Sequence, residues 1–229
     1  MKITQSTSPN KSTGRSDWTP DIIVCHITEG SFEGAVSWLT NPASQVSSHF
    51  VVAQDGRVAQ LVKIEDTAWA NGTSSNPSDS RSNQNSRLAA VRERGVNANL
   101  YTISIEHEGR LSETQGALSP KQLTATTALI AHIRTEVKRI YGKEIPISRE
   151  HIVAHADITP KWKPNCPGEK FPFNEIINYL KNPPSPWAQE AWEWAIQNNI
   201  TDGTNPQGIP TREQMVKLLH NYEVFVRCQ

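Results

Sequence analysis

Apolar residues along the chain form short runs that predict several β-strands. Residues 21–27 are a short β-branched run, which predicts a buried strand. Residues 49–53 and 58–62 are two extended runs on either side of an Asp-Gly turn at 55–56, a pattern typical of a β-hairpin. Residues 152–154 predict one more short strand.

Residues 101–108 alternate between apolar and polar side chains. This alternation predicts a strand with Ile103 and Ile105 on one face. Ser104, Glu106 and Glu108 share the opposite face. The two glutamates are therefore expected to point away from the apolar side of the sheet.

Apolar residues at helical spacing predict helices between these strands. One helix is predicted over 32–39, before Asn41-Pro42, and a longer one over 120–141. Ser119 is a suitable N-cap for the long helix, and Gly142 ends it. Its apolar stripe consists of Leu123, Ile130, Ile133, Val137 and Ile140. Strands interleaved with helices predict an α/β fold with a mixed central β-sheet flanked by helices.

Two segments lack this periodicity and divide the chain. Residues 71–86 are mostly Ser and Asn and predict a long exposed loop. Residues 181–186 contain three prolines and predict a stiff linker. We therefore expect a domain of residues 1–180, a linker of residues 181–186 and a small module of residues 187–229. The module's pattern predicts a helix, a glycine-containing loop at 199–204 and a second helix.

Composition excludes several classes of protein. With 229 residues, 36% of them hydrophobic, the chain can bury a core without a disulfide scaffold. The 23 Lys+Arg balance the 23 Asp+Glu, which argues against a nucleic-acid partner or an anionic membrane surface. No apolar run approaches the roughly 18 residues of a membrane span, and the first residues lack a signal-peptide pattern. We expect synthesis in the cytoplasm, with any export by another route.

Histidines and cysteines supply the candidate chemistry. The three cysteines, at 25, 166 and 228, are too few and odd in number for a disulfide framework. His26 lies near the end of a predicted strand and is either functional or a hydrogen-bonded core residue. His151 and His155 are four apart, which along a strand places them about 13 Å apart, too far to share a metal ion. Cys166, in a proline-rich loop, is either a zinc-binding thiolate or an incidental small residue.

Four segments, in this order, resemble the zinc-dependent N-acetylmuramoyl-L-alanine amidases of the phage-lysozyme and peptidoglycan-recognition-protein type. They are IIVCHIT at 22–28, SSHFVV at 47–52 with DG at 55–56, TISIE at 102–106, and HADI at 155–158 with CPG at 166–168. Each segment alone is weakly specific, but four in order over about residues 18–173 are a strong signal. The resemblance implies the peptidoglycan-recognition-protein-like amidase fold.

The resemblance also implies a metal site and a reaction. It implies that His26, His155 and Cys166 bind Zn²⁺ and leave a fourth position open to water. The implied reaction is hydrolysis of the amide between N-acetylmuramic acid and L-alanine in bacterial peptidoglycan. Glu106 matches the family's glutamate and would transfer the proton, with Glu108 as the second candidate; the alternative is a solvated strand glutamate.

Many members of the family place a lysine two residues before the last metal ligand, where it stabilises the oxyanion. Here Lys163 stands three residues before Cys166, and Lys161 is the alternative. Trp69 is expected either to bind substrate in the groove or to pack in the core. His49 matches a recurrent family histidine that is not a ligand, with a structural or substrate-binding role.

Residues 187–222 resemble a single S-layer-homology motif, a cell-wall anchoring unit usually present in several copies. One copy cannot bury much core alone. The module is therefore expected to bind the wall, to pack against the larger domain or to self-associate.

These resemblances favour a peptidoglycan hydrolase, specifically a phage or prophage endolysin, because endolysins commonly lack a signal peptide. The alternative is a non-catalytic peptidoglycan-binding module of the same fold. Such proteins typically replace a metal ligand, whereas Cys166 is retained here. A purely structural zinc site is a third interpretation, and it would need no Glu106.

Overall fold

The computed structural model describes residues 2–201, 203 and 206–227, and at its centre is a six-stranded mixed β-sheet. In spatial order the strands are β1 (Ile3–Gln5), β5 (Val58–Gln60), β4 (Phe50–Val52), β7 (Thr102–His107), β3 (Ile22–Ile27) and β8 (Ile152–Ala154). All neighbouring strands are parallel except β4 and β5. A separate antiparallel pair consists of β2 (Lys11–Ser12) and β6 (Thr67–Ala68).

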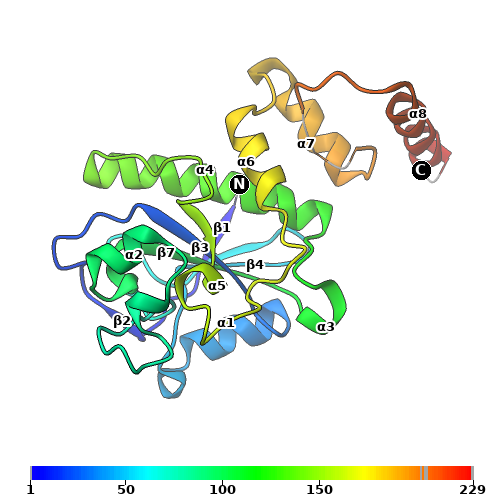
Figure 1. Cartoon of the computed structure of the whole chain (residues 1–229). Coiled ribbons are helices and arrows are strands. Elements are labelled where there is room, and N and C mark those ends of the chain that lie inside the picture. The colour runs from blue at the N-terminus through cyan, green and yellow to red at the C-terminus, as the bar shows by residue number, and fades with distance from the viewer. Residues whose placement is uncertain (1, 202, 204–205, 228–229) are drawn as a thin grey trace.

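Helices cover both faces of the sheet (Figure 1). On one face lie α4 (Pro120–Tyr141) and α6 (Phe173–Lys181), packed on a core that includes Ile23, Cys25 and Ile105. On the other lie α1 (Phe32–Thr40), α2 (Ala89–Arg94) and α5 (His155–Ile158). The remaining helices of this part are α3 (Leu111–Thr114), η1 (Pro42–Ser44), η2 (Asn83–Asn85) and η3 (Ala98–Tyr101). The predicted α/β class, with a mixed sheet between helices, is confirmed.

Several local predictions are confirmed in detail. The strands around Asp55-Gly56 form an antiparallel hairpin, although β5 ends at Gln60, two residues earlier than expected. Helix α4 has the predicted bounds, and the Ser119 hydroxyl accepts a hydrogen bond from the Gln122 backbone N–H. Gly142 ends this helix in the left-handed conformation that glycine adopts without steric cost.

Two local predictions need correction. The segment 71–86 was expected to be an exposed loop, but Asn71, Ser82 and Asn83 are buried, because the segment folds back on itself and against the domain. His155 was placed at a strand end, but it begins helix α5 directly after β8. That helical turn directs the chain from the sheet edge toward the loop that carries Cys166.

The C-terminal residues form two further helices, α7 (Gln189–Gln197) and α8 (Arg212–Arg227), preceded by η4 (Pro186–Ala188). Helix α7 contacts α4, and the rings of Trp194 and Phe225 pair α7 with α8 at 5.6 Å. Both helices lie beyond α6, to one side of the sheet (Figure 1). Cys228 and residues 202 and 204 of the predicted loop lie outside the described residues. Among the described helices, none has the length and apolarity that crossing a bilayer requires.

Arg15 is a buried cation that joins segments far apart in sequence. Only 4% of its surface is exposed, and it donates hydrogen bonds to backbone carbonyls of Ile64 (2.7 Å), Leu100 (3.0 Å) and Thr102 (3.1 Å). Its guanidinium also lies 2.8 Å from Nε2 of His49. Burial lowers the pKa of Arg15 to about 10, so it stays charged at neutral pH. These bonds tie the segment before β3 to the start of β7.

The variant Arg15→Met tests this role. Removing the donors leaves several buried carbonyls without partners, so the free energy of unfolding should fall by about 3–5 kcal/mol, measured by urea denaturation. Arg139→Met is the matched control, since Arg139 is exposed on α4 and pairs with Glu136. It should change stability by no more than about 1 kcal/mol. Equal effects of the two substitutions would contradict the structural role of Arg15.

Candidate metal centre

Two strand ends and one loop bring the candidate metal ligands together. His26 is the fifth residue of β3, and its side chain lies opposite Cys25, which packs in the core beneath α4. His155 follows β8 directly, and β8 is the other parallel neighbour of β3. Cys166 lies on the loop after α5. The backbone carbonyl of Cys166 accepts a hydrogen bond from the Ala156 N–H at 3.0 Å, which holds this loop against the start of α5. In open α/β sheets, ligands bind at this edge, outside the carboxyl ends of parallel strands.

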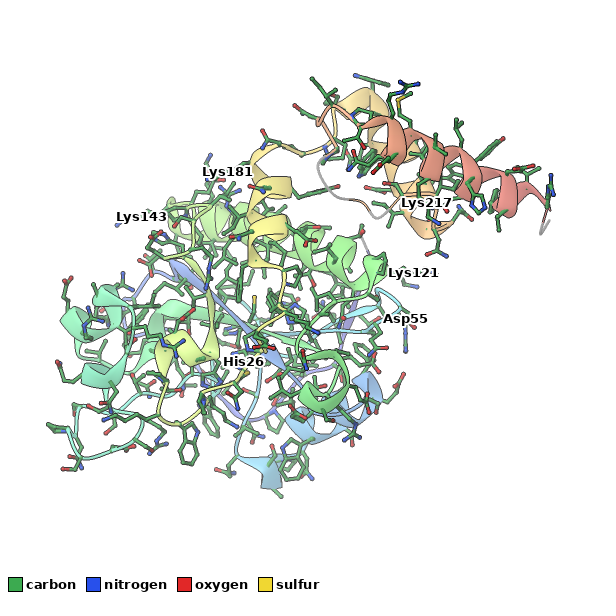
Figure 2. The ribbon with its side chains drawn as sticks, turned by 45° about the vertical axis from the view of Figure 1, so that its right-hand side comes forward. His26, Asp55, Lys121, Lys143, Lys181 and Lys217 are labelled. Atoms are coloured by element: carbon green, nitrogen blue, oxygen red, sulfur yellow. The ribbon has the colours of Figure 1, made fainter. Side chains whose placement is uncertain are left out.

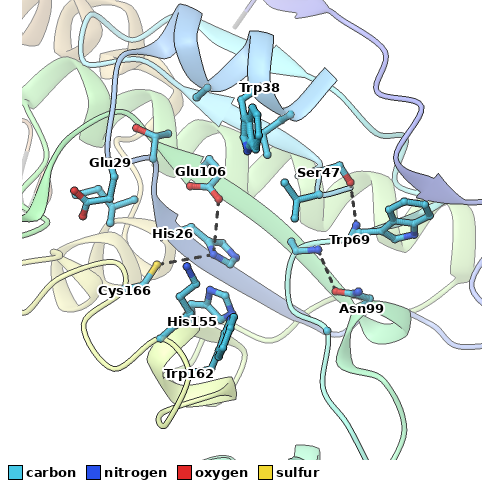
Figure 3. A pocket seen from close by; sticks show the side chains of 18 of the residues that line it. His26, Glu29, Trp38, Ser47, Trp69, Asn99, Glu106, His155, Trp162 and Cys166 are labelled. Atoms are coloured by element: carbon cyan, nitrogen blue, oxygen red, sulfur yellow. Dashed lines mark hydrogen bonds and ion pairs between the residues drawn. The ribbon is translucent and has the colours of Figure 1, made fainter. Parts of the chain in front are cut away.

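The three side chains converge on one point (Figure 3). A nitrogen of His26, a nitrogen of His155 and the sulfur of Cys166 all lie within 4.8 Å of one another. The sulfur of Cys166 is 3.9 Å from Nδ1 of His26, and the two imidazole rings meet edge to face at 4.4 Å. Two ligands of a tetrahedral Zn²⁺ ion would be about 3.5 Å apart at normal bond lengths. A site of two nitrogens and one sulfur fits Zn²⁺ and leaves the fourth position open.

Burial sets the protonation states of these ligands. Burial lowers the pKa of His26 well below its ordinary value and that of His155 to about 3. Both imidazoles are therefore neutral at physiological pH, with a lone pair available for a metal ion. Burial raises the pKa of the Cys166 thiol to about 12. A divalent cation deprotonates a thiol that coordinates it, so metal binding at this cysteine releases a proton.

Glu106 faces the same point from the neighbouring strand. It is the register partner of His26 across β3 and β7, and its Oε1 lies 3.9 Å from Nδ1 of His26. Burial raises the pKa of Glu106 to about 8, and the positive charge of Lys163 opposes part of this rise. A carboxyl group whose pKa lies near neutrality can both accept and donate a proton at physiological pH.

Of the two candidate lysines, only Lys163 lines the pocket that contains the ligands. Its charge affects the pKa of both Glu106 and His155. Lys161 is exposed on the same loop and lies outside that lining. Glu108 is also placed elsewhere: it follows the end of β7, and its carboxylate accepts a hydrogen bond from the Gln54 backbone N–H at 2.8 Å. The structure therefore favours Lys163 over Lys161, and Glu106 over Glu108.

The ligands lie at the bottom of an open cleft of about 870 Å³. Three tryptophans line its walls: Trp38 from α1, Trp69 after β6 and Trp162 from the loop before Cys166 (Figure 3). Trp38 and Trp162 are more than half exposed, and the guanidinium of Arg81 lies 5.8 Å from the centre of the Trp162 ring. Trp38, Trp162 and Arg81 were not anticipated, because no local motif distinguishes an exposed aromatic or basic residue on a cleft from one elsewhere.

The two residues expected to bind substrate lie in different environments: Trp69 lines the cleft, whereas His49 is buried. The indole N–H of Trp69 donates to the Ser12 hydroxyl at 3.1 Å. His49 is 1% exposed, and its ring contacts Arg15, the Ser104 hydroxyl and the Asp66 carbonyl. The expectation that His49 contacts substrate is therefore corrected. Its side chain is enclosed by the domain and takes the structural role that was the other possibility.

Comparisons with known proteins identify the family of this chain. The N-acetylmuramoyl-L-alanine amidase family matches residues 16–169. N-acetylmuramoyl-L-alanine amidase A of Achromobacter lyticus is 30% identical over 129 residues, which cover 56% of this chain and 58% of that protein. AmiD of Escherichia coli K12 is 28% identical over 165 residues, which cover 68% of this chain and 51% of that protein. The chain thus spans only part of the length of these relatives.

Solved structures share the fold at lower identity. A selenomethionine derivative of AmpD superimposes with a TM-score of 0.54 at 20% identity, covering 78% of this chain and 93% of that chain. PlyL superimposes with a TM-score of 0.53 at 19% identity, covering 79% and 97% respectively. The matched family region spans most of the chain and includes every strand from β3 to β8. This chain therefore belongs to the N-acetylmuramoyl-L-alanine amidase family.

Proposed function

We propose that this protein is a zinc-dependent peptidoglycan hydrolase that cleaves the amide between N-acetylmuramic acid and L-alanine. The observation that carries the proposal is the convergence of His26, His155 and Cys166 within 4.8 Å, with Glu106 beside them. When bound, a zinc ion supplies a Lewis acid for the scissile carbonyl and lowers the pKa of a water molecule. His26, His155 and Cys166 would hold it.

Residues of this chain would transfer the protons and stabilise the negative charge that develops during the reaction. Glu106 accepts a proton from the attacking water and passes it to the nitrogen of the leaving L-alanine, a transfer suited to its raised pKa. Lys163 stabilises the oxyanion that forms on the carbonyl oxygen, since it lines the same cleft. Trp69 and the other tryptophans provide flat apolar walls for sugar rings and the peptide.

A non-catalytic peptidoglycan-binding protein of the same fold is the alternative. Such a protein would need the cleft and its aromatic walls, but neither a complete set of metal ligands nor a buried carboxyl beside them. A structural zinc site would not need the open cleft. The presence of Cys166 and Glu106 at one point therefore supports the enzyme.

We also propose a division of labour along the chain. Residues 1–180 form the catalytic domain, residues 181–186 the linker and residues 187–229 a wall-directed module like one S-layer-homology motif. Helix α6 ends at Lys181, and α8 has no buried residue of its own. Figure 2 shows His26 within the larger part and Lys217 on α8, well outside it. Such an arrangement fits an endolysin of phage or prophage origin that acts on the wall after release.

Metal removal tests the reaction. Purified protein incubated with Gram-positive cell walls should release new N-terminal alanine without new reducing sugar, and a chelator should abolish this release. Zn²⁺ added in excess of the chelator should restore it. Lysis that persists after complete removal of metal would disprove the proposed mechanism.

Two substitutions separate metal binding from proton transfer. Glu106→Gln should retain one Zn²⁺ per chain and lower kcat by about 10²–10⁴-fold, because the proton acceptor is lost. Cys166→Ala should lose most of its Zn²⁺, measured by elemental analysis after dialysis, and lose turnover with it. Near-normal turnover of Glu106→Gln would show that another group is the base.

Deleting the C-terminal helices tests the division of labour. A chain that ends at Pro186 should retain Zn²⁺ and cleave a soluble muropeptide as the whole chain does. Its affinity for intact cell walls, measured by co-sedimentation, should fall by about 10²-fold or more, because a linked second binding module is lost. Unchanged sedimentation would rule out wall binding. An unfolded product would instead show that α7 stabilises the domain through its contact with α4.

A further inference from the structure

Nε2 of His26 and Oδ1 of Asn71 are two of the buried polar atoms that have no hydrogen-bond partner of normal geometry; Oε2 of Glu106 is another. His26 is 2% exposed and Asn71 is 1% exposed, so water does not reach either side chain freely. A buried N–H or carbonyl without a partner costs about 1–3 kcal/mol, so we expect each of these two atoms to have a partner in the folded protein.

The orientation of the Asn71 amide is determined by its neighbours. Its Nδ2 lies 2.9 Å from Oγ1 of Thr102, and that hydroxyl donates its own proton to the carbonyl of Ala98 at 2.8 Å. The Thr102 oxygen can therefore only accept from Asn71, which requires the NH₂ group at this position. The backbone N–H of Asn71 donates to Oδ1 of Asn99 at 2.6 Å and anchors the residue. Oδ1 of Asn71 is consequently left free as an acceptor.

The orientation of the His26 ring follows from its other nitrogen. Nδ1 is the atom near Cys166 and Glu106, at 3.9 Å from each. A metal ion held at that point would bind the Nδ1 lone pair, which would leave the ring proton on Nε2. Burial has the largest effect on the pKa of His26 and lowers it; the Asn71 side chain lies close enough to the ring to raise it in part, although no hydrogen bond of normal geometry joins the two.

We propose that Asn71 is the positioning residue of the metal centre: its Oδ1 accepts the Nε2 proton of His26 and holds the Nδ1 lone pair toward the metal. Hydrogen bonds from Asn71 to Thr102 and from Thr102 to Ala98 would then fix the His26 ring relative to η3 and β7. Metal-binding histidines usually donate their second N–H to such an acceptor, and its loss weakens metal affinity by about 10–100-fold. This inference rests on the proposed zinc site, but it concerns affinity and not turnover.

The experiment measures the Kd for Zn²⁺ by competition with a chromophoric chelator. Asn71→Leu, which has nearly the same shape but no acceptor, should weaken binding by about 10–100-fold. Asn71→Asp loses the donor to Thr102 but retains an acceptor oxygen, and the Thr102 hydroxyl can turn its proton toward the carboxylate, so this variant should bind Zn²⁺ more tightly than Asn71→Leu. Asn83→Ala is the matched control, since Asn83 is a buried asparagine of the same 71–86 segment and lies outside the pocket lining. Its Kd should be unchanged.

The possible outcomes distinguish this inference from the proposed function. Folded Asn71→Leu with a native Kd overturns the inference alone, as does an equal loss of affinity in Asn83→Ala, which would indicate a general effect on the segment. Weak binding in both Asn71→Leu and Asn71→Asp would also overturn it, because the acceptor would then be irrelevant. A native chain that binds no Zn²⁺ overturns the proposed function itself. The Co²⁺-substituted protein gives a second readout, since its visible absorption should shift in Asn71→Leu.

Discussion

The parallel pairing of β3 with β7 on one side and β8 on the other is the constraint on which the proposed metal centre depends. Parallel register places His26 directly beside Glu106 and brings the end of β8, with His155, to the same edge of the sheet. A slip of one residue in either pairing would turn one of these side chains toward α4. The alternation that buries Ile23 and Cys25 under that helix therefore also decides which face carries the chemistry.

Burial at this edge has two effects that work together. It keeps both imidazoles neutral and raises the pKa of the Glu106 carboxyl to about 8. The same enclosure leaves polar atoms that need partners inside the protein, and Asn71 fits that need for His26. The cleft above is open and lined by tryptophans, so a ligand can enter it and reach the side chains that converge at its base.

Buried polar contacts also stabilise the strands that form this edge of the sheet. Arg15 joins the segment before β3 to the start of β7, and His49 packs against Arg15 and Ser104. A histidine in a segment that resembles a family motif is easily assigned to a binding groove, but here the ring is enclosed. Helix α8 differs from this packed part of the domain, because none of its side chains is buried and most of its apolar side chains, such as Leu218 and Leu219, are exposed.

Local pattern alone was sufficient for the strands at 22–27 and 102–107, the hairpin, and the bounds of α4, because side-chain periodicity and capping act over a few residues. The pattern also identified His26, Glu106, His155 and Cys166 as candidates by their resemblance to a family. It did not show that 71–86 is partly buried, that Lys163 and not Lys161 lines the cleft, or that the amide oxygen of Asn71 is buried without a partner. Those facts depend on contacts between segments tens of residues apart, and only the packed sheet and its loops bring such segments within a few ångströms.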